Sequence, residues 1–124
     1  MPHTLNIEAM GIVISLHGVV TGEEIFRLNS QIIDDERYSR WRYQIWDFTD
    51  IETIDVSVDQ LRSFVFQDSV ASRKNPHCRV AIITRKTAYT GLDSVFHLLA
   101  EEWGGYASQT FHSVRAARKW VAAS

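Results

Sequence analysis

The apolar and polar positions of this 124-residue chain follow two periods, one typical of strands and one typical of helices. Between Thr4 and Val20 apolar residues first alternate with polar ones and then become dense in "GIVISLHGVV". This stretch predicts two short strands, with a hairpin turn at Gly11 and its neighbours. Three more strands are predicted by "YQIWDF" (43–48), "CRVAIIT" (78–84) and "SQTFH" (108–112). The first two of these are apolar on both faces, as is expected of strands covered by helices on each side.

Helical spacing of apolar residues separates these strands. Thr21 and Glu24 form a capping-box pair, which begins a helix that ends in the charged run "DDER". Ser57 and Gln60 form a second such pair. The helix that they begin is expected to run from the next residue to about Ser72, since "RKNP" then disfavours helical geometry.

Two further helices complete the predicted order. Ser113 caps the last of them. The apolar face of the other is formed by Leu92, Val95, Phe96, Leu99 and Trp103. The order of elements predicts one α/β domain over residues 1–124, with a mixed five-stranded sheet and about four flanking helices. The sheet is expected to be antiparallel in its first hairpin and mostly parallel elsewhere.

An acidic stretch from Asp47 to Asp59 joins the predicted central strand to the next helix. Ligands of such sheets lie near the carboxyl ends of the strands, and clustered carboxylates bind hard cations. The spacing lacks the order of a calcium loop, however, and the earlier strand ends in His17 and Gly18, with no acidic pair. We therefore interpret the stretch as a solvated turn near a helix start and predict no metal site.

Composition and charge argue against several classes of function. A net charge of -2 provides no broad basic field, so nucleic-acid binding is not expected. The single cysteine, Cys78, cannot form an internal disulfide, which fits a reducing cytoplasm. No apolar run approaches the ~20 residues of a membrane span, and the first residues lack a signal-peptide pattern. We predict a cytoplasmic protein without a transmembrane segment.

Reaction chemistry is not indicated by the sequence. Cys78 and His77 are neighbours on a predicted strand, so their side chains point to opposite faces and do not share a proton. No phosphate loop, dinucleotide fingerprint or serine elbow is present. We predict that the chain is not an enzyme and needs no cofactor.

Two surface features are candidates for binding. Arg85, Lys86 and Thr87 follow a strand end and precede a helix, where a phosphate or headgroup is favoured, although such residues are often only solvated. Phe66 and Val70 lie nearly opposite the buried face of their own helix. Either a neighbouring helix covers these two side chains, or they are available to a second chain or an apolar ligand. We favour cover by a neighbouring helix, with a homodimer contact as the alternative.

The segment "DFTDIETIDVSVDQL" (47–61) resembles STAS domains of the anti-sigma-factor-antagonist type. In that family the central strand ends in an aspartate, and the next helix starts with an Asp-Ser-Ser-Gly segment. The residues that fall on this pattern are Asp47, Ile54, Asp55, Ser57 and Leu61. Over nearly its whole length, including the closing "FHSVRAARKW", the chain is similar to the SpoIIAA-like group of small bacterial proteins, which are related to STAS and to lipid-binding CRAL-TRIO folds.

This resemblance implies a non-enzymatic interaction or regulatory module that binds a protein partner or itself. It also implies that Ser57 matches the serine that is phosphorylated in STAS antagonists. Val56 and Val58 replace the small residues of that segment, so we favour a helix-capping role for Ser57 over a phospho-switch. A second hypothesis is a carrier or sensor of an apolar small molecule or lipid, held between the sheet and a helix surface formed by Leu92, Phe96 and Trp103.

Overall fold

The computed structural model describes residues 3–85 and 92–123. Within these residues, five strands form one sheet in the order β1-β2-β3-β4-β5. They are β1 (His3–Ile7), β2 (Gly11–Thr21), β3 (Tyr43–Asp55), β4 (Arg79–Ile83) and β5 (Ala107–Phe111). β1 pairs antiparallel with β2, and the other neighbours pair parallel, which confirms the predicted mixed α/β sheet.

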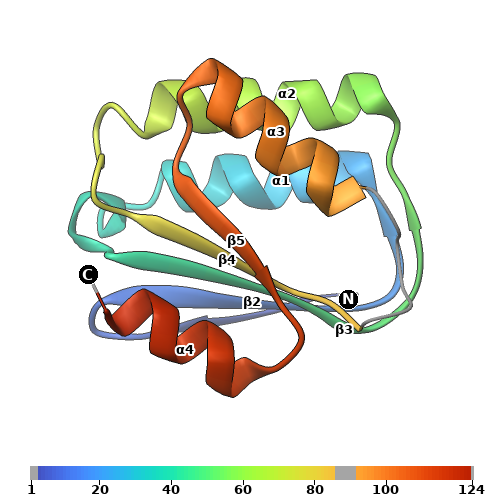
Figure 1. Cartoon of the computed structure of the whole chain (residues 1–124), viewed down its shortest axis with the longest axis horizontal. Helices are drawn as coiled ribbons and strands as arrows, with labels where there is room; N and C mark the ends of the chain where they lie inside the picture. Colours follow the sequence, from blue (N-terminus) through green and yellow to red (C-terminus); the bar gives the residue numbers. More distant parts are fainter. Residues whose placement is uncertain (1–2, 86–91, 124) are drawn as a thin grey trace.

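Helices cover both faces of the sheet (Figure 1). Three of the helices in the described ranges lie on one face: α1 (Gly22–Ile33), α2 (Val58–Ala71) and α3 (Leu92–Trp103). α4 (Val114–Ala122) lies on the opposite face. A short 3-10 helix, η1 (Tyr38–Arg40), precedes β3. In the described part of the chain, none of these helices combines the length and hydrophobicity needed to cross a membrane.

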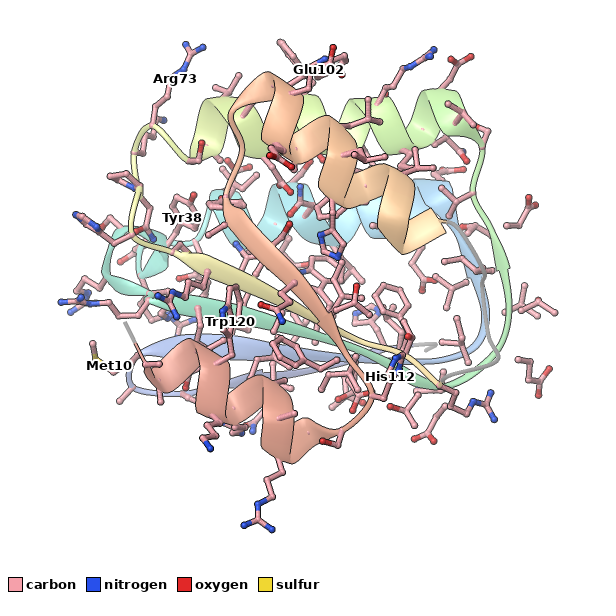
Figure 2. The ribbon with its side chains drawn as sticks, in the orientation of Figure 1. Met10, Tyr38, Arg73, Glu102, His112 and Trp120 are labelled. Atoms are coloured by element: carbon pink, nitrogen blue, oxygen red, sulfur yellow. The ribbon has the colours of Figure 1, made fainter. Side chains whose placement is uncertain are left out.

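The core has two parts, one on each face of the sheet. In β3, Trp46 packs into the larger part, beneath α1, α2 and α3, whereas the adjacent Ile45 packs into the smaller part against α4. Side chains on a strand alternate between faces, so a strand covered on both sides is apolar at consecutive positions. On the α4 side, Trp120 lies between the helix and the sheet (Figure 2), with its ring centroid 5.6 Å from that of Phe111.

The helix starts follow the predicted N-caps, but the capping box predicted for Thr21 and Glu24 is only half present, and the Glu24 carboxylate lies 3.7 Å from the His3 ring nitrogen instead. The Thr21 hydroxyl accepts a hydrogen bond from the backbone N–H of Glu24 at 3.3 Å. Ser113 accepts one from the backbone N–H of Ala116 at 3.1 Å. Each such cap satisfies a backbone donor that the helix leaves free and contributes about 1 kcal/mol.

Most of the acidic stretch, from Asp47 to Asp55, is part of β3, so the interpretation of these residues as a turn is wrong; Asp59 lies in α2. β2 continues to Thr21, and its extension pairs with β3 as far as Asp55. The register shifts twice along this ladder, and Gly18 adopts a φ of 71°, a region that favours glycine. At both shifts β3 advances one residue more than β2, so the extra residues lie on β3 and the two strands stay paired beyond them. The backbone of residues 50–55 therefore has ladder partners that its own sequence does not reveal.

The first hairpin also differs from the prediction, because its turn lies at residues 8–10, before Gly11. The backbone N–H of Glu8 donates to the carbonyl of Gly11 at 2.8 Å and closes this turn. Gly11 itself is the first residue of β2, and a Cβ atom there would overlap the ring of Tyr43. Glycine is needed at this position for close packing against an aromatic ring.

Candidate interaction surface and internal cavity

A groove of about 700 Å³ runs between α1 and α2 on the side that faces solvent. Its lining combines apolar side chains from three helices with a charged rim. Phe66 of α2 is 61% exposed, and the other exposed apolar side chains in the groove are Phe26, Val70 and Trp103. Arg62, Lys74 and Asp34 also line it. We call this feature the outer groove.

The expectation that a neighbouring helix covers Phe66 and Val70 is wrong. α1 and α2 meet through polar side chains: Asn29 donates to Gln67 at 3.0 Å, and Gln67 donates to Ser30 at 2.7 Å. These hydrogen bonds join the helices below the level of the exposed apolar residues. The groove above them stays open to solvent.

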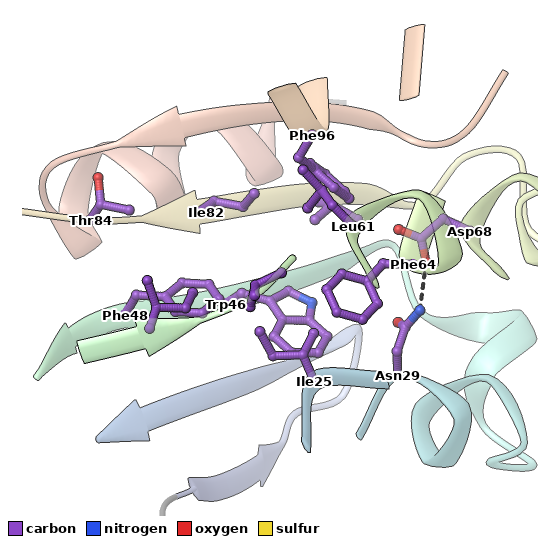
Figure 3. Close-up of a pocket in the computed structure, with 13 residues that line it drawn as sticks. Ile25, Asn29, Trp46, Phe48, Leu61, Phe64, Asp68, Ile82, Thr84 and Phe96 are labelled. Atoms are coloured by element: carbon purple, nitrogen blue, oxygen red, sulfur yellow. Dashed lines mark hydrogen bonds between the residues drawn. The ribbon is translucent and has the colours of Figure 1, made fainter. Parts of the chain in front are cut away.

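A second hollow, the inner cavity, lies between the sheet and α1, α2 and α3 (Figure 3) and has a volume of about 100 Å³. Nearly all of its lining is apolar. Contributing side chains include Trp46, Phe48 and Ile82 from the sheet and Ile25, Leu61, Phe64 and Phe96 from the helices. The polar residues in its lining are Asn29, Asp68 and Thr84.

Asp68 is a charged residue on the buried face of α2, and it is only 6% exposed. The amide of Asn29 donates a hydrogen bond to its carboxyl at 2.9 Å, as Figure 3 shows. Burial raises the pKa of Asp68 to about 7, and the hydrogen bond from Asn29 acts in the opposite direction. Asp68 is not among the candidate residues that the sequence pattern indicates. The available signal was its position one turn after Phe64, on the otherwise apolar stripe of the helix.

Ser57 is the N-cap of α2 and takes part in a complete capping box. Its hydroxyl accepts from the backbone N–H of Gln60 at 3.1 Å, and the Gln60 side chain accepts from the backbone N–H of Ser57 at 2.9 Å. Gln60 also lies directly against Gly22, where a Cβ atom would overlap its amide group. The starts of α1 and α2 are thus packed together, and Ser57 is exposed beside them.

No protein-family model matches the sequence, and no curated protein matches it. Solved structures do match the fold. The anti-sigma factor antagonist SpoIIAA in its unphosphorylated form aligns with a TM-score of 0.61 at 14% identity, covering 97% of each chain. SpoIIAA of Bacillus in its phosphorylated form aligns with a TM-score of 0.57 at 14% identity, covering 95% of this chain and 98% of that one.

A third similar structure is an uncharacterised protein of the DUF3478 family from Shewanella loihica PV-4, described as having a SpoIIAA-like fold. It aligns with a TM-score of 0.53 at 16% identity, covering 96% of this chain and 91% of that one. This chain has the SpoIIAA-like fold. The resemblance inferred from the sequence is confirmed at the level of the fold.

Within this SpoIIAA-like fold, α3 does not present the predicted residues as one ligand surface. Phe96 lines the inner cavity, whereas Trp103 lies in the outer groove. The side chain of Leu92 lies outside the described residues. α3 packs between β5 and α2, and His97 contacts the hydroxyls of Ser108 and Thr110 on β5 at 2.7 and 2.6 Å. The helix is therefore oriented by polar contacts that its apolar pattern does not show.

The anion candidate is only partly described. Arg85 donates a hydrogen bond to the backbone carbonyl of Ile51 on β3 at 2.9 Å, so one of its donors is used inside the SpoIIAA-like fold. Lys86 and Thr87 lie outside the described residues. Cys78 is buried, and this burial raises the pKa of its thiol to about 12, as is typical of a small core residue. Among the described residues, no group of His, Cys, Asp or Glu side chains gathers as a cation site.

Proposed function

We propose that this chain is a non-enzymatic regulatory module of the cytoplasm that binds a protein partner, or a second copy of itself, through the outer groove. The observation that carries this proposal is the exposure of Phe66, which lies in one groove with three other exposed apolar side chains. Single exposed apolar residues are common on protein surfaces, but a cluster of them in a concave site is typical of interaction surfaces. The net charge of -2 favours a protein over a nucleic acid as the partner.

The composition of the outer groove fits a protein interface. Phe26, Phe66 and Trp103 are aromatic, and aromatic residues are enriched at the centres of interfaces. Burying one such side chain stabilises a complex by roughly 2–3 kcal/mol. Arg62 and Lys74 add positive charge at the groove, where they would orient an acidic or amphipathic partner segment. Arg62 pairs with the highly exposed Asp59 at 3.3 Å, a contact that costs little to rearrange.

SpoIIAA, whose fold this chain shares, is named an anti-sigma factor antagonist and has been solved in phosphorylated and unphosphorylated forms. Ser57 is the candidate for such a modification here, because it is exposed at the start of α2. A phosphate there would be favoured by the helix N-terminus but opposed by Asp55 and Asp59. It would lie about 13 Å along the helix axis from Phe66, at the edge of the outer groove. We propose that capping is the primary role of Ser57.

The inner cavity supports the carrier hypothesis, and Phe96 is one of the residues that line it. A volume of about 100 Å³ is well below the several hundred Å³ that drug-sized ligands usually occupy. This volume favours a ligand much smaller than a lipid acyl chain. We therefore favour the interaction module over the lipid carrier.

A pair of matched variants tests the proposal. Phe66→Asp places a charge in the outer groove, and Val114→Asp places one at an exposed apolar residue of α4, on the opposite face of the sheet. Both variants are expected to keep the circular dichroism spectrum and melting temperature of the wild type. Sedimentation velocity on the purified proteins measures self-association, and complexes isolated from the native cells show which partners are retained.

The proposal predicts that Phe66→Asp weakens the affinity of the complex tenfold or more, while Val114→Asp leaves this affinity unchanged. Retention of the same complexes by both variants contradicts it. Unfolding of Phe66→Asp alone would also contradict it, because that result would place Phe66 in the core.

A further inference from the structure

We propose that the inner cavity is a binding site for a small, mostly apolar molecule that carries one hydrogen-bond donor, and that Asp68 accepts this hydrogen bond. The site is separate from the outer groove and concerns a different class of ligand. A module with such a site would report the presence of a small molecule as well as contact a protein.

The size and lining of the cavity set the apolar part of the ligand. A space of about 100 Å³ walled by Phe64, Trp46 and other apolar side chains has no partners for several ordered waters. Apolar cavities of ~150 Å³ in other proteins stay dry and bind benzene or xenon. An occupant here would be a molecule of benzene size or smaller, held by contact with aromatic and aliphatic side chains.

Asp68 sets the polar part of the ligand. One of its carboxyl oxygens accepts from Asn29, and no other donor to this carboxyl is present in the described part of the chain. An ionised carboxylate has about four acceptor sites, and burying it with few hydrogen bonds is costly. A donor that enters from the cavity would satisfy one of the remaining sites.

The carboxyl is also held in place for this contact. The side-chain amide nitrogen of Asn29 donates one hydrogen bond to Asp68, at 2.9 Å, and one to Gln67, at 3.0 Å. Both of its N–H groups are therefore occupied, and neither is available to a ligand. Figure 3 shows Asn29 and Asp68 facing each other at one end of the cavity, with Thr84 and Phe48 toward the other end. The pKa of Asp68, raised by burial to about 7, leaves the group mostly ionised at pH 8. At that pH the carboxylate is an acceptor.

A purely structural role for Asp68 is the competing interpretation. In that case the carboxyl only joins α2 to Asn29 of α1, and the space beside it is a packing defect that holds at most a water molecule. The two interpretations differ in what they predict for two probes of nearly equal shape, phenol and benzene, because only phenol carries a hydroxyl donor.

The test is an NMR titration of the full chain at pH 8 with phenol and, separately, with benzene. Phenol is expected to bind at least tenfold more tightly, since a hydrogen bond to a charged acceptor is worth that factor or more. The shifted amide signals are expected to belong to residues that line the cavity. Asp68→Asn should remove most of the preference for phenol, because the acceptor is then neutral.

Val80→Leu is the second variant. Val80 is buried in β4 and lines the cavity, so one added methylene fills part of it. This variant is expected to bind both probes at least fivefold more weakly. Its NMR spectrum without a probe is expected to be that of a folded protein. The proposal is overturned by equal affinities for the two probes, by the absence of binding, by shifts that map outside the cavity, or by unchanged binding in Val80→Leu.

Discussion

Asn29 of α1 donates a hydrogen bond at 2.9 Å to Asp68 of α2, and this contact places a carboxyl group between two helices at the wall of an apolar cavity. The two residues are 39 positions apart in the chain. Their contact connects the fold to both proposed sites, because it joins the helices that form the outer groove and orients the carboxyl beside the inner cavity.

The raised pKa of Asp68 predicts a pH dependence of stability. Burial raises the pKa from 3.8 to about 7, so between these pH values the folded state binds a proton that the unfolded state has released. The stabilisation from the neutral carboxyl is complete below about pH 4 and is lost as the pH rises through 7. Wild type should lose on the order of 1–4 kcal/mol of unfolding free energy relative to Asp68→Asn between pH 4.5 and 8. Urea denaturation of both proteins measures this, and a difference that is constant with pH would argue against a raised pKa.

Asn29→Ala removes the donor and leaves the buried carboxyl without its partner. We expect a loss of about 1–3 kcal/mol of unfolding free energy at pH 8, where the carboxyl is mostly ionised, and a smaller loss at pH 5. Ser30→Ala is the matched control, because Ser30 is the next residue of α1 and its contact with Gln67 is only partly buried. Equal losses of unfolding free energy in the two variants would show that the Asn29–Asp68 contact contributes no more to stability than the contact of Ser30 with Gln67.

The capping role of Ser57 predicts a modest and purely structural effect. Ser57→Ala should lower the unfolding free energy by about 1 kcal/mol and leave partner binding unchanged. Ser63→Ala is the comparison, because Ser63 is exposed in the same helix and its hydroxyl donates to the carbonyl of Asp59 within that helix. That variant should change stability by less than about 0.5 kcal/mol. Loss of a partner on Ser57→Ala, with stability intact, would instead support a switch.

Substitutions at Gly22 and Gln60 are expected to have non-additive effects on stability. In Gly22→Ala the new methyl group displaces the Gln60 amide, which breaks its hydrogen bond to Ser57 and costs about 1 kcal/mol. In a Gln60→Ala background the three nearest atoms are removed, so the same change should cost less or be stabilising, since alanine favours a helix over glycine. Thermal denaturation of wild type, the two single variants and the double variant measures the coupling free energy between the two substitutions. Additive effects would mean that the two side chains do not meet.

Much of the fold is predictable from local pattern. The strand at "CRVAIIT" follows from its near-continuous apolar run, and the start of α2 follows from Ser57 and Gln60, because the signals lie within a few residues of each other. The extension of β3 to Asp55 is not predictable in this way. Its ladder partners are the residues of β2 from His17 to Thr21, more than thirty residues earlier in the chain, and the pairing passes two register shifts.

The candidate sites were predictable only in part, for the same reason. The anomaly at Phe66 and Val70 was visible as helical spacing, but whether α1 covers them depends on how far apart two helices pack. The apolar spacing of α3 does not show that Phe96 lies at the inner cavity and Trp103 in the outer groove, because this depends on how α3 packs against α2 and β5. The buried position of Asp68 depends on its contact with Asn29, and no local sequence pattern indicates that contact.

The claim that the outer groove is the protein-binding surface is tested most directly by photo-crosslinking from a single position. A photoreactive phenylalanine analogue replaces Phe66 in one protein and Val114 in another, and both are irradiated in the native cells. We expect one dominant crosslinked species of defined mass from position 66 and none from position 114. No crosslink from position 66, or the same species from both positions, would contradict it.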